Sequence, residues 1–220
     1  METKFGGRKM LTFIYGVMGC GKSAQIIEYC EEHSDTACFK LKFELENPDK
    51  ITSRNGKSIP CINFYHDTDL QKLLFDSNAK NIIIDEAQFC TVEQINQLAN
   101  IAHDHEIFCY GLLFDNCGDL FPASKQLLLV CNHQHEIERN CVICNHHKAN
   151  ISARFTAEDD FLYKNNKEWK TTYPVLASKY VKYLSLCWHC WTRLTMLPAR
   201  QADFEYWVNH EEGDEHENNM

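Results

Sequence analysis

The sequence predicts an α/β fold, in which a domain built on a largely parallel sheet is followed by a smaller domain that carries two cysteine pairs. From Leu11 to Val130, short β-rich runs alternate with longer segments whose apolar residues have helical spacing, which is typical of βα units. After Cys131 the alternation stops, and the chain becomes rich in His, Cys, Asn and aromatic residues. We therefore expect a first domain at residues 1–135, a second at 136–197 and an acidic, disordered tail at 198–220.

The expected elements follow one another in βα order. Strands are predicted at Leu11–Tyr15, Ala37–Leu41, Cys61–Tyr65, Asn81–Asp85 and Ile107–Leu112, and helices at Ser23–Glu32, Asp67–Phe75, Val92–His103 and Ala123–Cys131. Thr91 and Gln94 predict a capping box for the third helix. In the second domain, Thr156–Lys170 is polar with scattered aromatic residues, which indicates a loop or flexible arm.

Length and charge limit the possible functions. A chain of 220 residues buries one good core with room for a small additional module. The net charge of −9 is concentrated in residues 201–220, which hold seven acids and neither Lys nor Arg. The rest has 22 basic and 24 acidic residues, a net charge of −2, and this near-neutral balance argues against binding to polymeric nucleic acid.

The chain is expected to be cytoplasmic and not bound to a membrane. It has no apolar run close to the roughly 20 residues that span a bilayer, and Met1–Lys9 lack the apolar segment of a signal peptide. In a reducing compartment, the twelve cysteines are expected to be buried thiols and metal ligands instead of disulfides.

A phosphate-binding motif lies between the first strand and the first helix. The segment Gly16-Val17-Met18-Gly19-Cys20-Gly21-Lys22-Ser23 fits G-x-x-x-x-G-K-S. Glycines let the backbone N–H groups curl around a phosphate, the lysine neutralises phosphate oxygens, and the serine hydroxyl can bind Mg²⁺. We expect ATP and phosphate to contact Gly16, Met18, Gly19, Cys20, Gly21, Lys22 and Ser23. The alternative is a chance glycine-rich turn.

The second half of a nucleotide site is expected at the end of the apolar strand Asn81–Asp85. Asp85 can hold Mg²⁺ together with Ser23, and Glu86 can accept the proton of an attacking hydroxyl as catalytic base. An Asp-Glu-Ala-Gln string also occurs in helicases, but a motor of that kind needs two such domains of about 150 residues each, more than this chain provides. A P-loop NTPase-like domain that transfers phosphate is therefore expected.

Two C-x₂-C pairs predict a structural Zn²⁺ site. Cys141, Cys144, Cys187 and Cys190 offer four thiolates, which suit tetrahedral zinc. The 42 residues between the pairs imply a long loop that the metal pins at both ends. Nearby histidines, His146, His147 and His189, are reserve ligands. We interpret this loop as a substrate cover tied down by zinc, although such a site is by itself equally compatible with a contact to nucleic acid or protein.

Taken together, the phosphate motif with Met18, the string Asp85–Phe89, the segments Tyr110–Leu112 and Asp119–Phe121 and the paired cysteines resemble a type II thymidine kinase. The resemblance implies a P-loop NTPase-like parallel sheet domain with a small zinc-ribbon and lasso domain, usually in a homotetramer. It also implies transfer of the ATP γ-phosphate to the 5′-hydroxyl of thymidine or deoxyuridine. It assigns the base pocket to Met18, Phe89, Leu112, Phe121 and the lasso residue Tyr183, for which the alternative is core packing.

The sequence departs from this family on the acceptor side. The region Glu44–Pro48 lacks the family's Asp-x-Arg motif, with Glu46 as the only stand-in, and Asn116 replaces an expected Phe. Cys117 stands where bacterial members often carry Arg, and Ser178–Lys179 replaces an expected Gly-Gly. Two alternatives therefore stay open: a kinase for another nucleoside, and a non-catalytic nucleotide-binding relative.

Overall fold

The computed structural model describes residues 9–42, 49–75, 77–158, 161–164 and 181–196. The chain divides into two compact units, the first made of Met1–Leu113 and Leu120–Ile137, the second of Phe114–Asp119 and Glu138–Met220. The expectations for Glu44–Pro48, for Ser178–Lys179 and for the tail from residue 198 lie outside the described residues.

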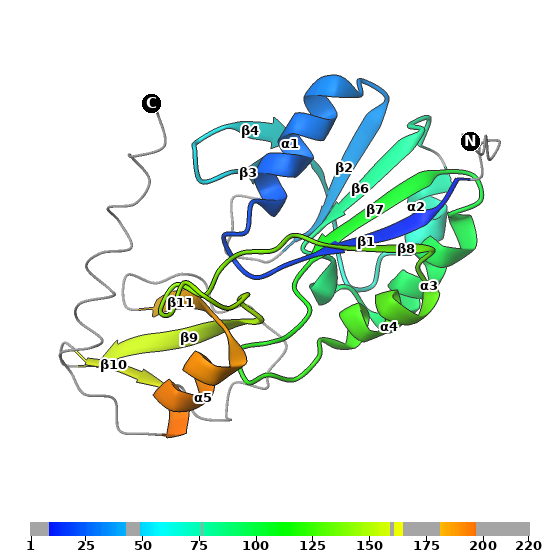
Figure 1. The fold of residues 1–220 in the computed structure, drawn as a ribbon. Coiled ribbons are helices and arrows are strands. Elements are labelled where there is room, and N and C mark those ends of the chain that lie inside the picture. The colour runs from blue at the N-terminus through cyan, green and yellow to red at the C-terminus, as the bar shows by residue number, and fades with distance from the viewer. Residues whose placement is uncertain (1–8, 43–48, 76, 159–160, 165–180, 197–220) are drawn as a thin grey trace, which may run out of the picture. The chain divides into compact units, whose positions relative to one another are not determined.

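A six-stranded parallel sheet forms the centre of the first unit (Figure 1). Its order is β5-β2-β6-β7-β1-β8, with β1 Leu11–Tyr15, β2 Thr36–Leu41, β5 Ile62–Phe64, β6 Asn81–Asp85, β7 Glu106–Gly111 and β8 His133–Glu136. All neighbouring strands run parallel, so the predicted α/β class is confirmed. β8 was not predicted, because its polar sequence His-Gln-His-Glu shows no strand alternation and it is held as an edge strand by pairing with β1.

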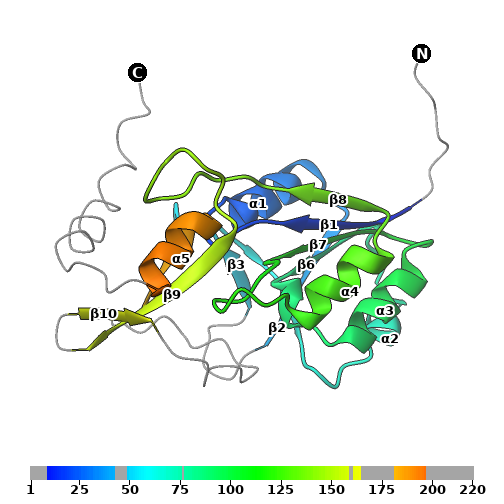
Figure 2. The same cartoon turned by 60° about the horizontal axis from the view of Figure 1, so that its bottom comes forward.

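Helices cover both faces of this sheet. Helix α1 (Lys22–Glu32) lies on one face, and α2 (Leu70–Phe75), α3 (Val92–Ile101) and α4 (Pro122–Val130) lie on the other, as both views show (Figures 1 and 2). Alternate residues of β6 serve the two faces: Ile82 and Ile84 pack in the larger core, and Ile83 packs with Ile26 of α1. Within the described part of the chain, no helix has the length and apolar content needed to cross a membrane.

A small hairpin, which the sequence analysis did not predict, lies between β2 and β5. Its strands β3 (Lys50–Thr52) and β4 (Ser58–Pro60) pair antiparallel, and Ile51 is buried in the core beneath α1. Gly56, with φ of 83°, makes the turn, and Lys57 forms an exposed ion pair with Glu31 at 3.2 Å. Three-residue strands are too short to show a period in sequence, which is why this hairpin escapes prediction.

The second unit contains a three-stranded antiparallel sheet and one helix. The sheet order is β10-β9-β11, with β9 Ile151–Glu158, β10 Phe161–Lys164 and β11 Val181–Leu186, followed by α5 (Trp188–Met196). The prediction of a loop at Thr156–Lys170 is therefore wrong for residues 156–158 and 161–164, and residues 165–170 lie outside the described part. The polar composition suggested a loop, but the backbone N–H and C=O groups of these residues are hydrogen-bonded by pairing between strands.

This sheet also joins the two ends of the long segment between the cysteine pairs. Six residue pairs, from Val181↔Thr156 to Leu186↔Ile151, join β11 to β9. The expectation of a long loop that the metal pins at both ends is corrected: the two ends of this segment are strands that pair with each other through their backbones.

Candidate active site and metal-binding cluster

The motif Gly16–Ser23 forms the turn between β1 and α1. Gly19 and Gly21 have φ values of 73° and 100°, in the left-handed region that other residues rarely enter. Gly16 has no room for a side chain, because a Cβ there would lie 2.5 Å from the carbonyl oxygen of Ile137. The glycines thus allow a tight turn that delivers the chain to the N-terminus of α1, where helical N–H groups favour an anion.

Lys22 closes this turn from inside. It is buried, and its Nζ donates hydrogen bonds to the carbonyl oxygens of Gly16 at 2.9 Å and Val17 at 3.0 Å. The Cys20 Sγ lies 3.8 Å from the same Nζ. Ser23, the next residue, is half-buried in the first turn of α1. The structure therefore places Gly16 and Cys20, two of the predicted phosphate residues, beside the Lys22 charge.

Asp85 ends β6 on the same face of the sheet as α1. Ile83, two residues earlier, packs in the core against α1, and side chains two apart in a strand share a face. Burial raises the pKa of the Asp85 carboxyl, and the neighbouring charge of Glu86 adds to that rise. The charge of Lys40, on the adjacent strand, is the largest influence that opposes it. A buried carboxylate near two lysines can bind a divalent cation through oxygen.

Glu86 follows Asp85 in a strained conformation. Its φ of 55° and ψ of 38° are left-handed, which costs a non-glycine residue about 1–2 kcal/mol. Its backbone N–H donates to Asp85 Oδ1 at 3.0 Å, and its side-chain Oε2 accepts a 2.6 Å hydrogen bond from Gln88 Nε2. Such strain at the end of a strand is typical of functional sites, and this half-buried carboxylate is the candidate proton acceptor.

Three of the predicted base-pocket residues gather at the carboxyl end of β7. The rings of Phe89 and Phe121 meet edge to face with centroids 5.6 Å apart, and Phe89 packs against the larger core. The Leu112 backbone N–H donates to Gln88 Oε1, two residues from Glu86, so this corner adjoins the acidic pair. Met18 lies apart from this group in sequence, within the phosphate turn, where it is half-buried.

Tyr183, the predicted lasso residue, belongs to the second unit. It lies on β11 directly opposite Arg154 of β9. Burial raises the pKa of the Tyr183 hydroxyl, and the charge of Arg154 opposes this. Tyr183 is therefore part of the pairing between β9 and β11.

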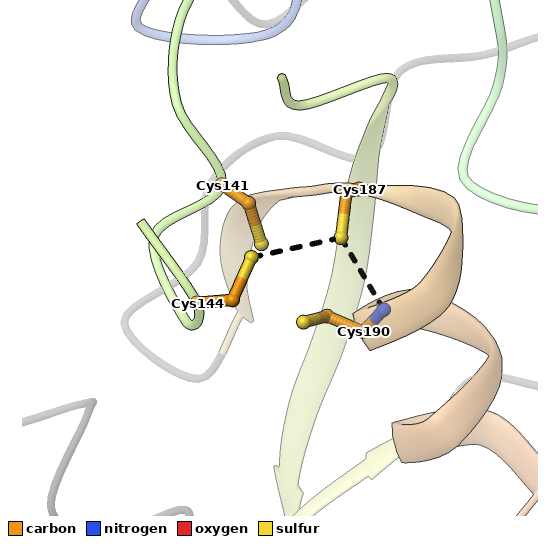
Figure 3. Close-up of side chains that lie close together, drawn as sticks. All are labelled: Cys141, Cys144, Cys187 and Cys190. Atoms are coloured by element: carbon orange, nitrogen blue, oxygen red, sulfur yellow. Dashed lines mark hydrogen bonds between the residues drawn. The ribbon is translucent and has the colours of Figure 1, made fainter. Parts of the chain in front are cut away.

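Cys141, Cys144, Cys187 and Cys190 form one cluster in the second unit, as predicted. Figure 3 shows the four side chains directed into the space between the Cys141–Cys144 turn and the start of α5. All four sulfur atoms lie within 4.8 Å of one another. Zn–S bonds of about 2.3 Å in a tetrahedron require sulfur separations of about 3.8 Å, so the cluster has the size of such a site.

The local backbone explains how each pair presents its sulfurs. The first pair lies in a turn that the hydrogen bond from Asn145 N–H to the Cys141 carbonyl closes at 2.8 Å, with Asn145 left-handed at φ of 50°. The second pair begins α5: the backbone N–H of Cys190 donates to Cys187 Sγ at 3.4 Å, in the manner of a helix cap. A helix start favours a thiolate.

The thiols of the cluster differ in acidity. The backbone N–H of His146 is the largest influence that lowers the pKa of the Cys144 thiol, to about 5. Burial instead raises the pKa values of Cys187 and Cys190, so a metal ion that binds these sulfurs would have to displace their protons. His147 Nδ1 lies 3.5 Å from Cys144 Sγ, beside the cluster.

A family model described as thymidine kinase matches residues 9–191 of this chain. The chain belongs to the thymidine kinase family. Its relatives include the thymidine kinases of Zymomonas mobilis, 33% identical over 60% of this chain and 74% of that protein, and of Agrobacterium fabrum, 34% identical over 67% and 81%. That of Photorhabdus laumondii is 29% identical over 80% and 89%. Among solved structures, the Legionella pneumophila ATPase DotB matches with a TM-score of 0.33 at 18% identity, over 57% of this chain and 36% of its own.

In this thymidine kinase family member, two side chains that contact or adjoin the acidic pair were not predicted as site residues from the sequence. Gln88 was noted only as a letter of the Asp-Glu-Ala-Gln string, and its burial and its bond to Glu86 appear only in three dimensions. Lys40 neighbours Asp85 across the β2–β6 pair. Its signal in the sequence is a charge inside the strand Ala37–Leu41, between Phe39 and Leu41.

Proposed function

We propose that this chain transfers the γ-phosphate of ATP to the 5′-hydroxyl of a deoxynucleoside, with thymidine as the main acceptor. Its relatives are named thymidine kinases, which supports the choice of acceptor. The observation that carries the proposal is the pair of consecutive acids at the end of β6, in which Asp85 is buried and Glu86 is accessible enough to meet a substrate. A protein that only binds ATP does not need the second carboxylate.

On the phosphate side, the roles follow from the contacts within the turn. The Lys22 ammonium, which already binds two carbonyl oxygens, can exchange them for phosphate oxygens and neutralise their charge. The Ser23 hydroxyl and the Asp85 carboxylate are hard oxygen donors of the kind that Mg²⁺ prefers. Held by these two residues, Mg²⁺ would supply positive charge that offsets the charge of the transferred group.

On the acceptor side, Glu86 accepts the proton of the 5′-hydroxyl as the oxygen attacks phosphorus. Its held Oε2 leaves Oε1 to receive the proton. The base is proposed to lie against Phe89, Phe121 and Leu112, with Met18 completing the pocket within the first unit. The edge-to-face pair of Phe89 and Phe121 offers two apolar rings nearly at right angles, against which a pyrimidine ring can pack.

The four-cysteine cluster is proposed to hold structural Zn²⁺. A closed set of four thiolates leaves no open position for substrate, which is the arrangement of structural sites. The cysteines are also part of the core of the second unit, with Ile151, Leu184 and Leu186, so the metal completes that core. Assembly as a homotetramer in the cytoplasm is proposed from the family resemblance, and light scattering of the purified protein checks the assembly.

The test is turnover with Mg-ATP and a panel of nucleosides, for the parent and for Glu86→Gln. The substitution keeps size and hydrogen bonding but removes the proton acceptor, so kcat should fall by about 10² to 10⁴ while ATP affinity stays the same. Glu93→Gln, an exposed glutamate in the first turn of α3, is the matched control and should keep full activity.

Each part of the proposal can fail separately. Normal turnover in Glu86→Gln would exclude this residue as the base. Phosphorylation of another nucleoside in preference to thymidine would correct the acceptor. A parent protein that binds Mg-ATP tightly and phosphorylates none of the nucleosides would be the non-catalytic relative considered from the sequence.

A further inference from the structure

Gln88 connects the candidate base to the neighbouring strand. It lies in the 3₁₀ turn Ala87–Phe89 (η1) and is 2% exposed, which is unusual for an uncharged polar side chain unless its groups are hydrogen-bonded. Its Nε2 donates to Glu86 Oε2 at 2.6 Å, and its Oε1 accepts from the backbone N–H of Leu112 at 3.0 Å. One amide therefore spans from the carboxylate that follows β6 to the backbone that follows β7.

The backbone decides which way this amide faces. The Leu112 N–H can only donate, so it must meet the oxygen of the Gln88 amide and not the nitrogen. The NH₂ group is then directed at Glu86, where it can only donate to the carboxylate. A reversed amide would place two donors together at Leu112 and two acceptors together at Glu86, at a cost of the order of 1–3 kcal/mol for each unsatisfied buried group.

Gly111 provides the space for this arrangement. A Cβ at Gly111 would lie 2.7 Å from Gln88 Oε1 and 3.2 Å from the Gln88 backbone nitrogen. Gly111 is the last residue of β7, and its φ is not in the left-handed region, so its backbone would accept any residue. The glycine is required by the neighbouring amide and not by the conformation of the strand.

We propose that Gln88 is a positioning residue for the phosphoryl transfer: it holds the Glu86 carboxylate so that Oε1 faces the acceptor hydroxyl, with Gly111 as the space that admits it. The inference rests on the proposed role of Glu86 as base. Glu86 needs such a support because its left-handed backbone alone does not determine where a flexible glutamate side chain points. Misplacement of a catalytic group by about 1 Å can cost about 10²-fold in rate.

The experiment is a double-mutant cycle on the full chain. Gln88→Met fills the volume without hydrogen bonds, and kcat should fall by about 10- to 100-fold with little change in the KM for ATP. In a Glu86→Gln background, the same substitution should change kcat by less than about twofold, because Gln88 acts only through the base.

Gln94→Met is the matched control. Gln94 is also 2% exposed and also bonds backbone groups, accepting from Thr91 N–H and donating to the carbonyl oxygens of Tyr65 and Thr68. This control should lower the melting temperature and leave kcat of the folded protein unchanged.

Two further variants keep the test decisive if Gln88→Met does not fold. Gln88→Glu still accepts from Leu112 N–H but places a carboxyl group against Glu86. When protonated this group can donate, and when ionised it repels Glu86, so the ratio of variant to parent kcat should fall as the pH rises. Gly111→Ala should displace the amide and lower kcat in the same way as Gln88→Met.

Fully active Gln88→Met or Gly111→Ala, a kcat ratio for Gln88→Glu that does not vary with pH, or equal losses from Gln88→Met in the parent and Glu86→Gln backgrounds would each overturn the inference. These outcomes leave the role of Glu86 intact if Glu86→Gln alone lowers kcat by about 10² to 10⁴. Normal turnover in Glu86→Gln would instead remove the proposed base, and with it the reason for positioning it.

Discussion

Lys40 on β2 and Asp85 on β6 occupy neighbouring positions across a parallel strand pair, where side chains in register point to the same face of the sheet. A half-buried cation thus lies beside the buried carboxylate that is proposed to bind Mg²⁺. The strand register therefore places a cation beside this acid, at the last residue of β6.

Lys40→Met should raise the pKa of the Asp85 carboxyl in the metal-free protein. Burial already raises this pKa, and the charge of Lys40 is the largest influence that opposes the rise, so its loss favours the protonated carboxyl. The loss of one charge contact is worth of the order of 1 kcal/mol, or about fivefold in the proton-binding constant. NMR of the carboxyl carbon over a series of pH values measures the change.

Lys42→Met is the control for this measurement, because the Lys42 Nζ lies 5.9 Å from the ring centroid of Tyr65. The same NMR titration of the metal-free protein compares the variants. An unchanged Asp85 pKa in Lys40→Met would show that the charge of this lysine does not act on the acid.

Zinc should copurify at about one ion per chain, and a chelator should loosen the second unit before the first. The cluster shares its core with β9 and β11, whereas the first unit has its own cores around its sheet. Because β9 and β11 also pair through their backbones, the Cys141–Cys144 turn and α5 should lose hydrogen-exchange protection earlier than that ladder. Cys141→Ser should have the same effect as the chelator, and Cys131→Ser, outside the cluster, should keep its zinc.

Trp188→Ala should loosen the loop Phe114–Asp119. The rings of Trp188 and Phe114 meet edge to face with centroids 5.2 Å apart. A Cβ added at Gly118 would lie 3.2 Å from the Trp188 ring, so this tryptophan packs against the loop at both Phe114 and Gly118. Faster hydrogen exchange at residues 115–119 checks this, with the exposed Arg193→Ala on the same helix as control. Since Trp188 directly follows Cys187, metal removal should loosen the same loop; protection unaffected by both treatments would contradict the connection.

Thr91→Ala should lower the free energy of unfolding of the first unit by about 1 kcal/mol. Thr91 and Gln94 form the predicted capping box, with hydrogen bonds of 3.1 Å and 3.0 Å in the two directions. Urea denaturation measures the free energy of unfolding of this variant and of the control Thr52→Ala, at an exposed strand position. Equal free energies of unfolding for the two variants would mean that the Thr91 cap does not stabilise the first unit.

The features that could be read from the sequence are those whose cause lies within a few consecutive residues. A glycine-rich turn before a helix, an acid after three isoleucines, a Thr91–Gln94 cap and two C-x₂-C turns each carry their own geometry, because local sterics and hydrogen bonds determine them. The same applies to the strands β1 and β6, which were placed to the residue, since apolar runs between breakers define their ends.

Tertiary structure alone decided which of these pieces support one another. The turn of Gln88 toward Leu112, the register of Lys40 with Asp85, the edge strand β8 and the β9–β10 pairing all join residues from separate elements. The segment Phe114–Asp119, which follows β7 in sequence, packs with α5 and belongs to the second unit. Such contacts depend on how strands pair and side chains fill a shared core, a property of the whole chain that no local pattern encodes.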